Sequence, residues 1–173
     1  MHPLLDVFKH KPLDLTESSI RLVQVLPDEG PLIQCQIRHS ILSSDHTCLS
    51  YTWGSPSDDQ LTILLNGKPF KVQRNLWEFL NVARTKYLKT WFWIDAICII
   101  QDDANPEKSH QVQQMGNIYR NACLVIAWLG KAPNKYAELC LSLIEDKKTF
   151  DQDDIDYFET REVSTPSKSQ IAM

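Results

Sequence analysis

Asp95 lies in the middle of an apolar run, WFWIDAICIIQ (residues 91–101), where a charged side chain calls for an explanation. A carboxylate in such surroundings is unfavourable unless it is paired, protonated or close to the open end of a strand. A second carboxylate, Glu107, follows in the first turn of the next helical pattern, and Gln111 lies one turn further on the same helix face. These side chains are candidates for a site that binds a small ligand.

The elements around these residues decide whether they meet. The run at residues 91–101 is rich in β-branched and aromatic residues, which predicts a strand covered on both faces, as in a parallel sheet. Ligands of open α/β sheets bind beyond the carboxyl ends of the strands. We therefore expect one polar rim at the strand ends, formed by Tyr51, Trp53, Gly54, Asp95, Cys98, Gln101, Glu107, Gln111 and Trp128.

Each candidate also has an ordinary structural interpretation. Glu107 near a helix N-terminus would complement the helix dipole, and Asp95 would hold a loop by accepting backbone N–H bonds. Trp53 would pack in the core, as most tryptophans do. Cys98 would be a small core residue, since no nearby base argues for thiolate chemistry.

Alternation and turn residues predict seven strands. Asn66-Gly67 is a strong hairpin signal between two of them. The predicted strands cover residues 19–26, 32–39, 47–53, 61–65, 69–72, 91–101 and 123–129. From residue 69 onward strands and helices alternate. The sequence therefore predicts an α/β fold with a central, mainly parallel sheet flanked by helices and with added N-terminal β-hairpins.

Three helices are predicted between these strands. The first runs to about residue 86 with Asn75 as its N-cap. The second begins at Asn105-Pro106, a capping side chain followed by proline, and runs to about residue 122. Its apolar spacing predicts that it buries Val112, Met115, Tyr119 and Ala122. The third covers residues 134–147.

Length and composition are those of one soluble domain, with 173 residues, 43% of them hydrophobic and 23% charged. We expect a lead-in at residues 1–18, the domain at 19–148 and an acidic, polar tail or linker at 149–173. No apolar segment is long enough for a membrane helix. The first eleven residues lack a signal-peptide core, and five cysteines in apolar contexts suggest reduced thiols. These features predict an intracellular, cytoplasmic protein.

The charge distribution and the metal-ligand spacing disfavour two further functions. Residues 145–162 contain eight acidic and three basic residues, and no basic patch in the sequence suits a nucleic-acid backbone. The spacing of Cys35, His39, His46 and Cys48 matches no compact zinc pattern. We expect neither nucleic-acid binding nor a metal site.

Six ordered motifs resemble the fungal heterokaryon incompatibility (HET) domain. The match spans roughly residues 19 to 130, because the Ile20-Arg21-Leu22 strand is also similar to the family's usual lead-in. The motifs are LSYTWG (49–54), NL (75–76), WIDAICIIQ (93–101), EKSHQVQQM (107–115), IYRNA (118–122) and WLG (128–130). Two positions depart from the family pattern: Ile100 replaces an asparagine and Lys108 an arginine, which keeps the charge but loses the bidentate fork.

The resemblance implies a trigger of regulated cell death in fungal non-self recognition, part of fungal innate immunity. HET domains are also thought to be similar to Toll/interleukin-receptor-type (TIR) domains, which have a flavodoxin-like fold. Some TIR domains hydrolyse NAD when they self-associate. By that analogy a carboxylate would stabilise an oxocarbenium-like transition state, and aromatic groups would stack on the rings.

The resemblance also suggests which carboxylate acts. Glu107 and Asp95 match the HET motifs, with Glu107 preferred, and Glu138 is a less favoured candidate from the remote TIR alignment. Tyr51, Trp53, Gly54, Cys98, Gln101 and Gln111 would bind the substrate. No cofactor is expected, since NAD would be the substrate.

Two functions remain open. The first is an NAD nucleosidase that acts as a homo-oligomer, with a possible regulatory protein partner. The second is a non-enzymatic module for homotypic interaction in the cell-death pathway.

Overall fold

The computed structural model describes residues 6–16, 18–27, 30–54, 59–130 and the backbone of residues 160–163. The predicted third helix, including Glu138, lies outside these residues. The strands are β1 (Ser19–Val25), β2 (Gln34–Ile41), β3 (Thr47–Tyr51), β4 (Gln60–Leu65), β5 (Lys68–Gln73), β6 (Phe92–Trp93), β7 (Leu124–Trp128) and β8 (Thr160–Val163). The helices are α1 (Arg74–Lys86), α2 (Asp95–Cys98) and α3 (Pro106–Asn121).

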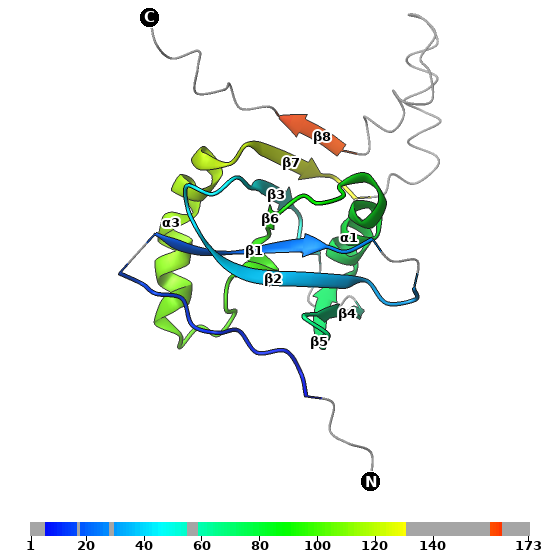
Figure 1. The fold of residues 1–173 in the computed structure, drawn as a ribbon, viewed down its shortest axis with the longest axis horizontal. Helices are drawn as coiled ribbons and strands as arrows, with labels where there is room; N and C mark the ends of the chain where they lie inside the picture. The colour runs from blue at the N-terminus through cyan, green and yellow to red at the C-terminus, as the bar shows by residue number, and fades with distance from the viewer. Residues whose placement is uncertain (1–5, 17, 28–29, 55–58, 131–159, 164–173) are drawn as a thin grey trace, which may run out of the picture.

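The strands form one sheet in the order β5-β4-β2-β1-β6-β3-β7-β8 (Figure 1). Both predicted hairpins are confirmed, because β1 pairs antiparallel with β2 and β4 with β5. In the part of the chain that is described, parallel pairing is limited to β2–β4, β3–β6 and β3–β7. The α/β class is therefore confirmed, but the sheet is mixed rather than mainly parallel.

The two long helices cover opposite faces of this sheet. Neighbouring residues of a strand point to opposite faces. In β6, Phe92 packs edge-on against Phe79 of α1, whereas Trp93 packs against Tyr119 of α3. Figure 1 shows α1 and α3 on opposite sides of the sheet accordingly.

The predicted strand at residues 91–101 is wrong over most of its length. Only Phe92–Trp93 form β6, and the chain then turns into the short helix α2. The N–H of Cys98 donates to the carbonyl of Ile94 at 2.7 Å, and the carboxylate of Asp95 accepts from the N–H of Ala96 at 2.7 Å. A short apolar run suits a buried helical turn as well as a buried strand, so periodicity alone does not separate them.

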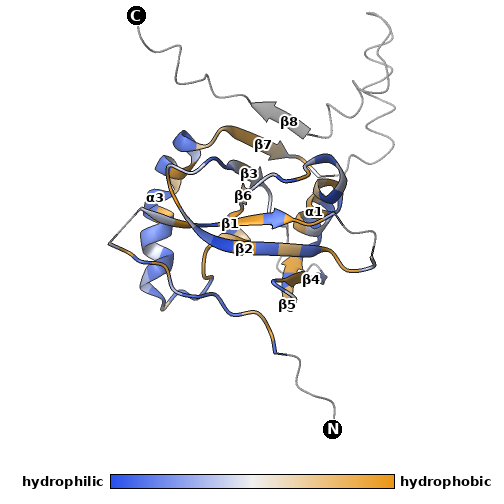
Figure 2. Cartoon of the chain, viewed as in Figure 1, coloured by the Kyte–Doolittle hydropathy of each residue, from blue (hydrophilic) through white to orange (hydrophobic). Residues whose placement is uncertain are grey.

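Two further expectations about the helices need correction. The N-cap of α1 is Gln73, and Asn75 lies inside the first turn, where it bonds other elements instead. The helix α3 begins as predicted, with the Asn105 side chain accepting from the N–H of Glu107. Its buried residues, however, include Glu107 and Gln111, while Val112 is exposed. Figure 2 shows α3 coloured mainly hydrophilic, whereas β7 is coloured hydrophobic.

Candidate functional site

Asp95 and Trp53 meet at the carboxyl ends of two neighbouring parallel strands. Trp53 follows β3, and Asp95 is the first residue of α2, just after β6. The indole Nε1–H of Trp53 donates to Oδ2 of Asp95 at 2.9 Å. The Trp53 side chain is otherwise open, with 43% of the residue exposed. The strand ends thus present a held carboxylate beside an accessible aromatic ring.

Burial is the main influence on the acidity of this site. It raises the pKa of Asp95, and the hydrogen bonds from Trp53 and Ala96 partly oppose that rise because they stabilise the ionised form. The pKa of Tyr51, at the end of β3, is also raised, first by burial and then by the Asp95 charge. Tyr51 and Asp95 are therefore close enough to influence each other.

Hydrogen bonds from a side chain to backbone carbonyls hold the loop beside Asp95. Nε2 of Gln101 donates to the carbonyls of Asp95 and Ile99 at 3.0 and 3.1 Å, which fixes the loop after α2. Gly54 has a φ of 87°, so the chain turns away directly after Trp53 in a conformation that favours glycine. We call the set Tyr51, Trp53, Gly54, Asp95 and Gln101 the Asp95 rim.

Asn75 ties the neighbouring strand ends together. Its Nδ2 donates to the carbonyl of Thr52 at 2.5 Å, and its Oδ1 accepts from Nε1 of the buried Trp128 at 2.8 Å. The ends of β3 and β7 are thus both anchored to α1. Sequence reasoning placed Asn75 within a family motif but gave it only a capping role.

Glu107 belongs to a different cluster. Its Oε1 accepts from Nη1 of Arg21 at 2.5 Å, and its Oε2 accepts from Nη2 of Arg21 at 2.8 Å and from the N–H of Leu13 at 2.9 Å. The side chains of Arg21 and Glu107 are only 2% and 4% exposed. Burial alone would raise the pKa of Glu107, but the bonds from Arg21 and Leu13 and the Arg21 charge outweigh it and lower the pKa.

Gln111 and Cys98 also face the interior. Nε2 of Gln111 donates to the carbonyl of Ser19 in β1 at 2.9 Å, and the residue is fully buried. Burial raises the pKa of the Cys98 thiol to about 12. Cys98 is therefore a core residue, as its structural interpretation expected, whereas Gln111 is buried and not on an exposed helix face.

The expected single rim therefore divides into two sets. Tyr51, Trp53 and Asp95 come together as predicted, whereas Glu107 and Gln111 pack against β1. The physical reason is Arg21, a buried cation on β1 whose ion pair the sequence analysis did not predict. An arginine between the apolar residues Ile20 and Leu22 of a strand was the available signal, because a buried charge needs a buried partner.

Neither a metal site nor a membrane helix is found in the described part of the chain. No group of three or more His, Cys, Asp and Glu side chains there is placed to hold an ion. None of the helices described is both long and apolar enough to cross a membrane.

Comparisons with known proteins identify relatives of this chain. The protein-family model described as heterokaryon incompatibility protein (HET) matches residues 46–172. A curated relative, heterokaryon incompatibility protein 6, OR allele, from Neurospora crassa, is 35% identical over 99 residues, which cover 50% of this chain. The match covers only 14% of that relative's length. No solved structure matches significantly.

Proposed function

This chain belongs to the heterokaryon incompatibility (HET) family, and on that premise we propose that it triggers regulated cell death in fungal non-self recognition. The proposed reaction is hydrolysis of NAD or a related nucleotide at the Asp95 rim, switched on when copies of the domain associate in the cytoplasm. The observation that carries this proposal is the Asp95 carboxylate, which is held at 2.9 Å by the indole of the exposed Trp53.

The chemistry follows from these two side chains. The bond between the ribose C1′ and the nicotinamide nitrogen breaks, and its electron pair leaves with the nicotinamide. The positive charge that develops on the ribose is stabilised by the ionised Asp95. A water oxygen then bonds to C1′ and a proton is released. The Trp53 ring offers a surface on which a flat nicotinamide or adenine ring stacks.

This assignment changes the preferred carboxylate. Glu107 was favoured from the motif, yet both of its oxygens accept bonds from Arg21 and Leu13 inside the protein. A carboxylate saturated in this way is suited to joining α3 and the N-terminal segment to β1. Asp95 is therefore the acting group in the proposal, and Glu107 is structural.

A nicotinamide-release assay tests the proposal. Purified protein is incubated with NAD at increasing concentration and with a crowding agent, and free nicotinamide is measured. We expect release that rises more steeply than protein concentration and is lost in Asp95→Asn. Asp102→Asn is the matched control, because Asp102 is an exposed residue of the following loop whose Oδ1 accepts from Ala104. Absent release under clustering conditions, or equal release by Asp95→Asn, contradicts the enzymatic proposal.

A non-enzymatic interaction module is the second candidate, and exposed apolar side chains favour it. Tyr51 of β3 pairs in register with Trp128 of the parallel strand β7, so the residues that follow the two strands lie at the same end of the sheet. Among them Trp53 and Leu129 are 43% and 76% exposed. If association alone kills, Leu129→Lys should abolish cell death in a fungal host, whereas Asp95→Asn should leave it intact.

A further inference from the structure

A cavity of about 430 Å³ lies on the other side of β1 from β6, the strand that Asp95 follows. It is formed by residues 8–11 of the N-terminal segment, by β1 and β2, and by Asn66 and Lys68 at the hairpin of β4 and β5. Its size falls within the range of about 300–1,000 Å³ that is usual for small-molecule sites. None of its lining residues belongs to the Asp95 rim.

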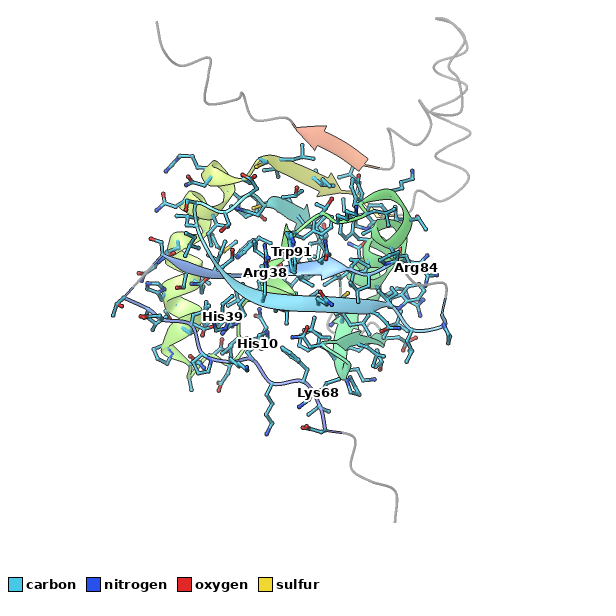
Figure 3. All side chains as sticks on the ribbon, viewed as in Figure 1. His10, Arg38, His39, Lys68, Arg84 and Trp91 are labelled. Carbon is cyan, nitrogen blue, oxygen red and sulfur yellow. The ribbon has the colours of Figure 1, made fainter. Side chains whose placement is uncertain are left out.

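The lining is strongly basic. It includes Lys9, Lys11, Arg21, Arg38, His39 and Lys68, and it contains no acidic side chain. Figure 3 labels Arg38 and His39 of β2 and Lys68 of β5, with His10 of the N-terminal segment nearby. In a protein with a net charge of −4, such a concentration of basic groups is unusual and favours an anionic ligand.

Only part of this positive charge is neutralised by the protein. Arg21 is paired with Glu107, and Lys68 with the exposed Asp6. None of the ion pairs found among the described residues involves Lys9, Lys11 or Arg38, although the charge of Lys9 contributes to lowering the pKa of Asp6. The guanidinium of Arg38 instead lies 3.9 Å from the ring centroid of Trp91, which lines an adjoining hollow.

The cavity walls are held by specific contacts. The N–H of Phe8 donates to the carbonyl of Pro69 at 3.1 Å, and the Phe8, His10 and Phe70 rings pack edge to face. The carbonyl of Lys11 accepts from Nη2 of Arg21 at 2.5 Å and from Nε2 of His39 at 3.2 Å. At the floor, Nε of Arg21 is buried and has no hydrogen-bond partner among the described residues.

We propose that this cavity binds a small phosphate-bearing molecule. The ammonium groups of Lys9 and Lys11 contact the phosphate oxygens, since lysine binds phosphate as a point charge. Phe8 and Ile37 offer apolar surface for the body of the ligand. The site is separate from the proposed NAD-hydrolysing rim and does not depend on it.

Isothermal titration of the full chain with inorganic pyrophosphate, adenosine diphosphate and adenosine tests this site. We expect both phosphate compounds to bind and adenosine alone not to bind. The Lys9→Gln/Lys11→Gln variant should lose about tenfold or more in affinity for pyrophosphate, since charge-assisted contacts are the strong ones. Both lysines are exposed, so the fold should tolerate the change.

The matched control removes the same two charges outside the cavity. Lys71 and Arg120 are exposed and do not line it, so Lys71→Gln/Arg120→Gln should bind pyrophosphate like the wild type. Binding that weakens equally in both double variants points to net charge alone and overturns the proposal. Wild-type protein that binds neither phosphate compound, or that binds adenosine as well as the diphosphate, also overturns it.

Discussion

Removing the Glu107 carboxylate should destabilise the fold strongly. The side chains of Arg21 and Glu107 are 2% and 4% exposed, so Glu107→Ala leaves a buried guanidinium without its counter-charge. Breaking a buried pair in this way costs roughly 3–5 kcal/mol. The N–H of Leu13 also loses its acceptor. For a domain of this size each kcal/mol lowers Tm by about 2–4 °C, so we expect a fall of roughly 6–20 °C.

Chemical denaturation and thermal unfolding measure this loss. The control is Asp103→Ala, which breaks the solvent-exposed pair with Lys108 and should change the stability little, because water screens such a pair. Arg21→Ala/Glu107→Ala should be less destabilised than the sum of its single variants, because no unpaired charge remains. The structural role of this pair is refuted if the stability losses of the two single variants add up in the double variant. It is also refuted if Glu107→Ala loses as little stability as Asp103→Ala.

The stability that the Arg21–Glu107 pair contributes should depend on pH in a defined direction. The pKa of Glu107 is lowered in the folded protein from its ordinary value of 4.5. The ion pair therefore contributes fully above pH 4.5, and its contribution is lost as the pH falls through the folded-state pKa. The stability difference between wild type and Glu107→Ala should shrink on acidification.

Two further predictions concern the strand ends. Because burial raises the pKa of Asp95 above its ordinary value of 3.8, the wild type loses stability as the pH rises through the folded-state pKa. In urea denaturation, the free energy of unfolding of Asp95→Asn should therefore increase relative to that of the wild type as the pH is raised from acidic to neutral. A difference between the two proteins that does not change with pH contradicts this. Asn75→Ala removes bonds to Thr52 and to the buried Trp128 and should cost about 1–3 kcal/mol in the same assay. Asn117→Ala, at an exposed position on α3, is the comparison, and an equal cost in both variants argues against the anchoring role of Asn75.

Local signals in the sequence predicted much of the fold. Asn66-Gly67 marked the β4–β5 hairpin, and Asn105-Pro106 marked the start of α3, because turn and cap chemistry depends on neighbouring residues. The short α2 was missed because Ile94, Ile97 and Cys98 would be buried in a strand or a helix alike.

The candidate site was predicted only in part, because its division depends on a contact between distant segments. The proximity of Trp53 and Asp95 followed from two parallel strand ends. The position of Glu107 followed from Arg21, which lies 86 residues earlier in the chain. From the helical spacing, Glu107 and Gln111 were expected on a polar, outward-facing side of the helix. Both are buried instead, because Glu107 pairs with Arg21 and Gln111 donates to the carbonyl of Ser19, both on β1.

The central claim is that the Asp95 rim, and not Glu107, carries the chemistry. Nicotinamide release per folded molecule, compared between Asp95→Asn and Glu107→Gln at low temperature, tests it most directly. Glutamine keeps an acceptor for Arg21, and circular dichroism gives the folded fraction of each variant. We predict that Asp95→Asn loses about 100-fold or more, as expected for a group that stabilises transition-state charge, while folded Glu107→Gln stays close to wild type. Activity that survives in Asp95→Asn and disappears in folded Glu107→Gln contradicts the account.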